Sequence, residues 1–266
     1  HSTDIRGGRI EMEKVDYEKL AQQALTEPGK LSDCYNKFWR YSFCNQSLAM
    51  MQLVQPEPIN TYNGWKKLGR QVKKGEKAIR LYMPVGIKDK DTGEDKMIFI
   101  LRANWFGFSQ TEGEGTAESI TPPEFDFRRM MEKLEIVYEN FSVVDGNCQG
   151  YSKPLQKIIA INPMAVNATK TTYHEIAHCL LHGDQISMND SLSLTPDVKE
   201  VEAELTAYIL GNVLGTADEQ TNIYSRGYIQ AWLRSNTTEK VRYSKVFSAV
   251  DKILKAGRDD KAASAE

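Results

Sequence analysis

The sequence predicts an α+β fold with two domains, a front domain of mixed helices and strands and a back domain that is mostly helical. The length of 266 residues exceeds one average domain. Long β-rich runs occur only in the first half, whereas helical periodicity dominates the second. A polar stretch at 111–124, with four glutamates and no lysine or arginine, separates the halves. The predicted boundaries are 10–112 for the front domain, 113–123 for the linker and 124–256 for the back domain.

The front half begins with helical patterns and ends with strand patterns. Apolar residues at helical spacing predict helices at 15–25 and 34–53, and the prolines that follow end the second one. Two runs rich in β-branched and aromatic residues predict strands at 79–87 and 97–108. The turn signal Asp91-Thr92-Gly93 between them indicates that the two strands form a hairpin.

The back half is mainly helical by the same criteria. A helix is predicted at 124–139, and the run KIIAIN predicts a short strand at 157–162, expected at the edge of a cleft where an extended peptide can add by β-pairing. The further predicted helices are 167–182, 197–214, 221–233 and 238–255.

The composition excludes several classes of protein. Hydrophobic residues make up 41% and charged residues 26%, which excludes a wholly disordered or fibrous chain. No apolar run approaches the roughly 20 residues of a membrane helix, and no signal-peptide pattern is present, so we expect a cytoplasmic protein with no membrane partner. The four cysteines form no Cys-x-x-Cys pair, which argues against a disulfide framework and a thiolate zinc site.

Charge is distributed unevenly along the chain. Residues 37–88 hold ten basic and two acidic side chains, a net charge of +8, although the whole chain carries −2. The remainder therefore carries −10. Such polarisation favours an anionic partner for the front half, with nucleic acid the first candidate. An ordinary solvated surface remains the alternative on charge alone.

The sharpest chemical signal is the segment His174-Glu175-Ile176-Ala177-His178 inside a predicted helix. Residues four apart lie on one face of a helix, one turn apart along it, so both imidazoles can reach one ion. Glu175 can then accept a proton from a water at that ion, as in the HExxH zincins. We predict one divalent ion, zinc, bound by His174 and His178, with Glu175 as the catalytic base.

A zinc site of this kind needs a third protein ligand. Glu200 and Glu204 lie one turn apart on the predicted helix 197–214, and Glu200 follows His178 by 22 residues. In the Glu-zincin arrangement Glu200 coordinates the ion, while Glu204 accepts a hydrogen bond from the non-ligating nitrogen of a ligand histidine. Because the Glu-x-x-Ala spacing recurs at Glu204, that residue remains the alternative ligand.

Other polar residues nearby receive different interpretations. Leu181 and Asp184 stand where a metzincin has glycine and histidine, so that class is excluded. His182 ends the predicted helix, where a histidine interacts favourably with the negative helix end. Glu202 is expected on another helix face, in solvent. Two tyrosines supply either an oxyanion donor or ordinary packing: Tyr224 and Tyr228.

Three segments of the front half resemble the N-terminal domain of ArdC-type antirestriction proteins: WRYSFCNQSLAMMQ (39–52), TYNGWKKLGRQVKKGEKAIRLYMP (61–84) and WFGFSQTEG (105–113). The back half is similar to the zincin-like domain of the same family, and HEIAHCLLH (174–182) also resembles the ImmA/IrrE peptidases. The resemblance covers about 15–235, with the segments in the expected order. It implies single-stranded DNA binding in front and a metallopeptidase-like fold behind. It also implies carriage on plasmids or other mobile elements of bacterial hosts, where the protein shields incoming DNA from restriction.

The front half has the residue types that single-strand binding needs. Basic side chains follow the phosphates, and aromatic rings stack on bases. For each aromatic residue core packing is the alternative role, and for the Asn45-Gln46 pair and the Lys73-Lys74 turn it is local structure or solvent. The predicted contacts are Trp39, Arg40, Asn45, Gln46, Trp65, Lys66, Lys67, Lys73, Lys74 and Arg80, with Tyr41, Tyr62, Tyr82 and Trp105 also interleaved.

Three functional hypotheses follow from these observations. The preferred one is a single-stranded-DNA-binding antirestriction protein with an HExxH metallopeptidase-like domain. The second is a DNA-directed metalloprotease that cleaves DNA-bound or regulatory proteins. The third is a protein whose metal only stabilises the back domain while DNA coating gives protection. Whether the peptidase turns over a protein or peptide substrate stays open at this level, because ligands can persist without activity.

Overall fold

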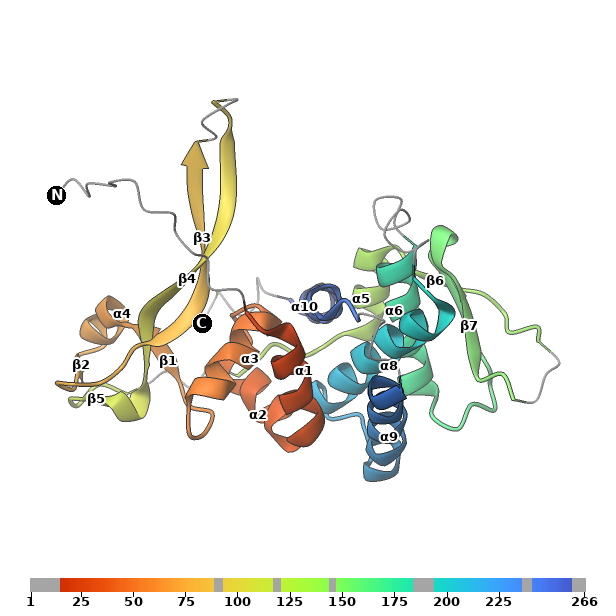
Figure 1. The fold of residues 1–266 in the computed structure, drawn as a ribbon, viewed down its shortest axis with the longest axis horizontal. Helices are drawn as coiled ribbons and strands as arrows, with labels where there is room; N and C mark the ends of the chain where they lie inside the picture. Colours follow the sequence, from red (N-terminus) through yellow and green to blue (C-terminus); the bar gives the residue numbers. More distant parts are fainter. Residues whose placement is uncertain are drawn as a thin grey trace.

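The computed structural model describes residues 15–88, 93–116, 121–143, 147–183, 194–235 and 241–259. It confirms the predicted α+β class, with a mixed front part and a mostly helical back part. Helices α1 to α3 lie in the middle of the elongated molecule, between the front sheets and the back helices (Figure 1). Within the described ranges, no helix is long and apolar enough to cross a membrane.

The first three elements are the helices α1 (Tyr17–Thr26), α2 (Gly29–Phe38) and α3 (Phe43–Gln52). The prediction of one continuous helix at 34–53 is therefore wrong. Ser42 has an extended backbone (ψ 152°) and caps α3, because its hydroxyl accepts a hydrogen bond from the backbone N–H of Asn45. Both helices bury one apolar face, so the apolar spacing continues across the break and conceals it.

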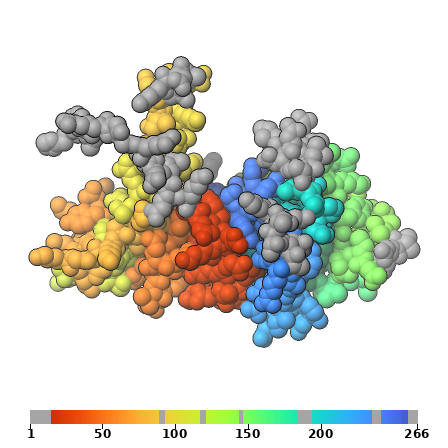
Figure 2. Space-filling view, viewed as in Figure 1, coloured from red at the N-terminus to blue at the C-terminus, as the bar shows by residue number. Residues whose placement is uncertain are grey.

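The front sheet has the order β1-β4-β3 and is built from β1 (Ile59–Thr61), β3 (Ile79–Lys88) and β4 (Asp95–Gly107). The strands β3 and β4 pair antiparallel, as predicted, with Met83 opposite Ile100. Their far ends form a two-stranded ribbon that projects from the body (Figures 1 and 2). The predicted turn at 91–93 lies largely outside the described residues.

A small corner that sequence patterns did not predict joins helix α4 (Tyr62–Lys67) to the sheet of β2 (Gln71–Val72) and β5 (Thr111–Glu112). Arg70 organises this corner. Its guanidinium lies 3.8 Å from the centre of the Phe108 ring and donates hydrogen bonds to the carbonyls of Thr111, Gly113 and Gly115. Gly69 precedes it with φ +74°, a left-handed conformation that favours glycine.

The back part begins with helix α5 (Phe127–Leu134), which ends at Glu135 in a left-handed conformation with φ 57°. The helix is thus shorter than the predicted range 124–139, and the last part of that range contains the strand β6 (Val137–Tyr138). The small sheet has the order β6-β8-β7, with β7 (Gly150–Lys153) and β8 (Ile158–Ile161) antiparallel. The predicted strand at 157–162 therefore exists but is central, and β7 is the edge strand beside the cleft.

Four longer helices complete the back part: α6 (Ala168–His182), α8 (Pro196–Val213), α9 (Glu219–Ser235) and α10 (Tyr243–Gly257). The side chain of Asn167 caps α6 by accepting from the backbone N–H of Lys170. Thr195 caps α8 in the same way and is followed by a proline at the first helical position. Helix α8 is buried along nearly its whole length, with small residues such as Ala203 and Ala207 at 0–1% exposure. This allows α6 and α8 to lie close together.

The main hydrophobic core contains residues from both sides of the predicted linker. The rings of Phe43 and Phe247 lie 5.1 Å apart, and the backbone N–H of Phe43 donates to Asp251 at 3.1 Å. Arg258 donates to the carbonyl of Trp39 at 2.6 Å. A second, smaller core lies under the front sheet. Helices α1 to α3 therefore connect the two parts through a shared core.

Candidate metal centre

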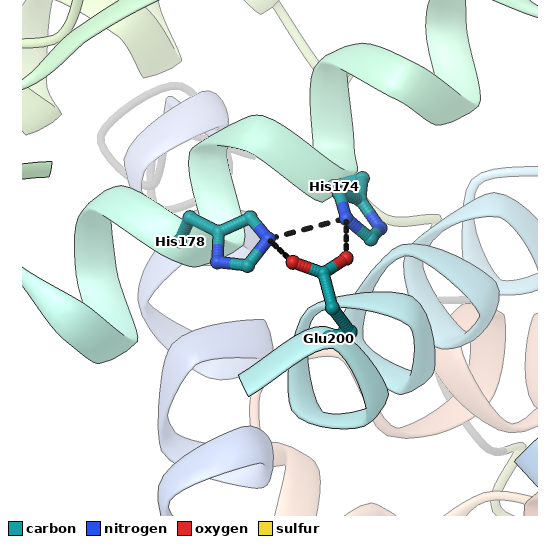
Figure 3. A group of neighbouring side chains, drawn as sticks. All are labelled: His174, His178 and Glu200. Carbon is teal, nitrogen blue, oxygen red and sulfur yellow. Dashed lines mark hydrogen bonds and ion pairs between the residues drawn. The ribbon is translucent and has the colours of Figure 1, made fainter. Parts of the chain in front are cut away.

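The HExxH segment lies on α6 and meets Glu200 from the first turns of α8. The Nε2 atoms of His174 and His178 are 3.2 Å apart. One carboxylate oxygen of Glu200 lies 3.2 Å from Nε2 of His174, and the other lies 3.3 Å from Nε2 of His178. Figure 3 shows the two rings and the carboxylate converging on one point. Among the described residues, these three form the group of side chains that can hold a metal ion.

The donor atoms have the chemistry and the spacing of a divalent-metal site. Two ligands bound to zinc at about 2.0–2.1 Å with tetrahedral angles are themselves about 3.3 Å apart. The separation of 3.2 Å between the two Nε2 atoms agrees with that value, and each oxygen of Glu200 lies at a similar distance, 3.2 or 3.3 Å, from one of the two nitrogens. Two imidazole nitrogens and one carboxylate leave a fourth position for water or substrate. The three side chains, whose ligand atoms lie within 4.8 Å of one another, can therefore hold a divalent ion.

Glu204 contacts the other nitrogen of His174. One oxygen of its carboxylate lies 3.3 Å from Nδ1 of His174, on the side of the ring away from Glu200. The other oxygen forms an ion pair with Nζ of Lys170 at 2.6 Å. This is the outer position predicted for Glu204, in which it orients a ligand histidine. The geometry favours Glu200 over Glu204 as the third ligand, because Glu200 alone reaches both Nε2 atoms.

A second set of polar contacts begins at the other ligand histidine. Nδ1 of His178 lies 3.0 Å from Nδ1 of His182, and Nε2 of His182 lies 3.2 Å from Glu202. Glu202 accepts from the backbone N–H, Nε and a terminal nitrogen of Arg242, at 2.7–3.0 Å. The prediction that Glu202 is solvated is wrong, since it is 0% exposed. His182 is also buried and contacts a ligand histidine as well as ending the helix.

The electrostatics of the centre favour a cation. Hydrogen bonds with the two ligand histidines hold the pKa of Glu200 well below its usual range. Burial would raise the pKa of Glu204, but its bonds with His174 and Lys170 lower that pKa to about 2. Burial would lower the pKa of His174, but Glu200 and Glu204 outweigh it and raise that pKa to about 9. Two ionised carboxylates therefore face the imidazoles.

In the buried pair of Glu202 and His182, the carboxylate is ionised and the imidazole is neutral. Burial would raise the pKa of Glu202, but hydrogen bonds from His182 and Arg242 lower it to about 2. Burial lowers the pKa of His182 below its usual value, and the cation of Arg242 acts in the same direction. At neutral pH, Glu202 is therefore a carboxylate and His182 an uncharged imidazole.

A cleft of about 560 Å³ opens at the three donor side chains. Glu175 lines it from α6, and the edge strand β7 lines it through Tyr151 and Ser152. The Glu175 side chain is buried at 7% exposure, beside the donors but outside the group of ligands. The cleft thus brings together the donors, the carboxylate of Glu175 and a strand edge.

The two tyrosines named as oxyanion donors lie on α9 and are both exposed, Tyr224 at 68% and Tyr228 at 47%. Neither side chain is therefore part of the core. Partial burial raises the pKa of Tyr228, and the carboxylate of Glu200 adds to that rise. Tyr228 is thus within electrostatic range of the centre.

The two tryptophans predicted to stack on bases are buried instead. Trp65 is 1% exposed, and its indole N–H donates to the carbonyl of Phe106 at 2.8 Å. Trp39 is 4% exposed and lies in the main core, covered by the guanidinium of Arg258 at 5.1 Å. Neither ring has a face free for a base, so both predicted DNA contacts are corrected to core residues.

The Asn45-Gln46 pair is structural as well. Asn45 is 8% exposed and pairs with the backbone of Tyr82 in both directions, its oxygen accepting at 2.8 Å and its nitrogen donating at 2.9 Å. Gln46 is 2% exposed and donates to the carbonyl of Tyr41. The bonds of Asn45 attach α3 to β3, the bond of Gln46 holds the segment before α3, and both side chains are buried. The predicted DNA roles of both residues are therefore wrong.

The remaining predicted contacts are exposed basic side chains: Arg40, Lys66, Lys67, Lys73, Lys74 and Arg80. Lys73 donates to the carbonyl of Ser109 at 2.8 Å. A cleft of about 460 Å³ at the α4 corner is lined by Lys66 and Tyr62, whose ring is 47% exposed. Exposure, which the sequence does not report, distinguishes Tyr62 from the tryptophans.

Comparisons with known proteins agree with this organisation. A family model for the N-terminal domain of anti-restriction factor ArdC matches residues 12–120. A search of curated protein sequences found no match. The metal-free crystal structure of the antirestriction protein ArdC from plasmid R388 is 21% identical, covers 92% of this chain and 96% of that chain, and has a TM-score of 0.51. The Mn(II)-bound structure is 18% identical with the same coverage and a TM-score of 0.53.

The segment that matches the ArdC N-terminal domain also comes first in this chain, before the helices that carry the three donor residues. Residues 12–120 thus match the model of the ArdC N-terminal domain, and the fold of the chain is similar to that of ArdC from plasmid R388 over 92% of its length.

Proposed function

We propose that this protein binds single-stranded DNA and acts as an antirestriction factor of a mobile element, with a zinc-dependent metallopeptidase-like centre in its back part. The observation that carries the proposal is the convergence of His174, His178 and Glu200 in a chain whose front part is an ArdC N-terminal domain. The antirestriction role comes from the similarity to ArdC of plasmid R388, whose crystal structure was also determined with Mn(II). The cytoplasm of a bacterial host is the compartment in which this role operates.

The residues of the back cleft support peptide hydrolysis. His174, His178 and Glu200 would hold a divalent ion, which would supply Lewis acidity for activating a water and polarising a carbonyl. The Glu175 carboxylate accepts the proton of the attacking water and passes it to the departing peptide nitrogen. Among the described residues β7 is an edge strand of its sheet, and it lines the same cleft, so an extended peptide can pair with Tyr151 and Ser152 through backbone hydrogen bonds. Zinc is the proposed ion because two histidines and a carboxylate with one open position are its usual catalytic ligands.

The exposed basic residues of the front part support binding to a single strand. Lys66 and Lys67 end α4, and Lys73 and Lys74 form the turn that follows β2. The half-exposed ring of Tyr62 lies at the start of the same helix, where a base can stack on it. The basic side chains then neutralise the phosphates on either side.

A cleavage assay tests the peptidase part of the proposal. The zinc-loaded protein is incubated with itself, with casein and with a DNA-bound protein, each with and without single-stranded DNA. We expect cleavage in the wild type and none in Glu175→Gln, because the amide cannot accept the proton. Zinc binding by Glu175→Gln serves as the control that the centre is intact. Equal cleavage by both proteins would contradict the role of Glu175.

The second candidate is a DNA-directed metalloprotease that cleaves DNA-bound or regulatory proteins. The open cleft with a strand edge favours it, since such a groove accepts a segment of another protein. Cleavage that requires single-stranded DNA would support this candidate. Absence of cleavage, together with zinc binding and DNA binding, would favour protection by DNA coating, with the metal as a stabilising element.

A further inference from the structure

We infer that His182 and Glu202 are positioning residues for the metal: together they fix the ring tautomer of His178, so that its Nε2 lone pair faces the ion. The inference rests on the proposed metal function of the centre. Neither residue belongs to the group of three donors. Their side chains are 4% and 0% exposed, so solvent does not compete for these contacts.

Arg242 fixes the carboxylate of Glu202. It donates three hydrogen bonds to that carboxylate, from the backbone N–H at 2.7 Å, from Nε at 3.0 Å and from a terminal nitrogen at 2.8 Å. This arrangement keeps the carboxylate ionised and fixed in position. An ionised carboxylate only accepts hydrogen bonds. Nε2 of His182, 3.2 Å from Glu202, must therefore carry the proton and donate it.

The next contact follows from the first. A neutral imidazole that is protonated on Nε2 has a bare Nδ1, which is an acceptor. Nδ1 of His182 lies 3.0 Å from Nδ1 of His178, so His178 must donate to it. The proton of His178 is then on Nδ1, and its Nε2 keeps a lone pair. That Nε2 faces His174 and Glu200, while the other ring nitrogen points away from them (Figure 3).

The two ligand histidines are thus oriented by carboxylates in two different ways. Glu204 contacts Nδ1 of His174 directly, at 3.3 Å. Glu202 acts on His178 through the intervening ring of His182, one helical turn further along α6. Arg242, from the segment before α10, anchors the indirect path. Removing an outer partner of a ligand histidine typically weakens metal binding 10–100-fold.

Two substitutions at one position separate this role from packing. In His182→Gln the side-chain amide can accept from His178 through its oxygen and donate to Glu202 through its nitrogen. In His182→Leu the side chain fills similar space but does neither. We expect His182→Leu to bind Zn(II) about 10–100-fold more weakly than the wild type. We expect His182→Gln to stay within about threefold of the wild type, on the same grounds.

Zn(II) affinity is measured by competition with a chromophoric chelator, and metal-free stability is measured in parallel by urea unfolding. A His182→Leu variant that binds Zn(II) as tightly as the wild type would overturn the inference, as would a His182→Gln variant no better than His182→Leu at equal stability. A wild type that binds no Zn(II) would instead refute the proposed metal function, so the two failures are distinguishable.

A second readout uses the zinc-loaded wild type and needs no variant to fold. Long-range proton–nitrogen NMR spectra report which nitrogen of each imidazole carries the proton. We expect His182 to be protonated on Nε2 and bare on Nδ1. The opposite tautomer at His182 would overturn the inference, whatever the affinities of the variants.

Discussion

The metal centre and the basic front surface use polar side chains in opposite ways. At the centre, Glu202 and Glu204 are buried, and each has a charged or imidazole partner at 3.3 Å or less. On the front surface, the candidate DNA contacts that remain are exposed lysines and arginines. A buried polar group is held in the geometry of its hydrogen bonds, because burying it without a partner costs free energy of folding. The spacing of histidine and glutamate residues along two helices therefore locates the metal centre in the sequence. The number of basic residues in the front part indicates only that this part suits an anionic partner.

The largest expected effect concerns the two aromatic residues of α4. Trp65→Ala should lower the free energy of unfolding by about 3–5 kcal/mol, because it removes a fully buried side chain and leaves a cavity. Tyr62→Ala, in the same helix, should cost under about 1 kcal/mol of stability, as surface changes do, but should weaken single-strand binding by about 1–3 kcal/mol through lost stacking. Urea unfolding and fluorescence anisotropy measure the two quantities. Normal stability in Trp65→Ala would show that the ring is not in the core.

The second prediction compares a buried ion pair with a surface pair. Arg242→Met should destabilise the protein by about 3–5 kcal/mol, because it leaves the carboxylate of Glu202 buried and uncompensated. Lys255→Met removes the cation of an exposed pair with Asp251 and should change stability by less than about 1 kcal/mol. Chemical unfolding in the presence of EDTA gives both values. Equal effects would refute the contrast between buried and exposed charge.

The third prediction separates ligand from base. His178→Ala should weaken Zn(II) binding by more than the roughly 100-fold that loss of an outer partner can cost. Glu175→Gln should keep an affinity close to that of the wild type, since Glu175 lines the cleft without belonging to the donor group. Isothermal titration calorimetry measures both. A large loss of affinity in Glu175→Gln would mean that this carboxylate is itself a ligand.

The fourth prediction concerns acid. The folded-state pKa of Glu202 is lowered to about 2, so the stability that its ionised form contributes is present above the unfolded pKa and is lost as pH falls toward 2. Between pH 5 and pH 3, with EDTA present, the wild type should therefore lose about 2 kcal/mol more stability than Glu202→Gln does. Unfolding curves at the two pH values test this. Parallel losses in both proteins would place the acid-sensitive group elsewhere.

The smallest expected effects concern single lysines of the front surface. Lys73→Ala and Lys74→Ala should each reduce the slope of log affinity for single-stranded DNA against log salt by about 0.7, the value for one phosphate contact. Lys255→Ala, on the back part, should leave the slope unchanged. A salt titration of each variant supplies the slopes. If Lys255→Ala changes the slope as much as the front variants, the strand does not follow the front surface.

The sequence predicted those features that depend on local spacing. The HExxH pair follows from the spacing of its residues, and the helix that carries Glu200 and Glu204 and the hairpin of β3 and β4 follow from the periodicity of their segments. The break between α2 and α3 was missed because the apolar period continues through it. Trp39, Trp65, Asn45 and Gln46 were misassigned because burial depends on contacts distant in sequence. The outer contacts of His182 were missed for the same reason, since Arg242 lies 40 residues beyond Glu202.

The most direct test of the metal centre is the anomalous scattering of a crystal of this protein grown with zinc. We predict one anomalous peak per chain within bonding distance of Nε2 of His174, Nε2 of His178 and the carboxylate of Glu200, with Glu175 and His182 outside the coordination sphere. A peak between His178 and His182, or zinc bound without Glu200, would contradict the account.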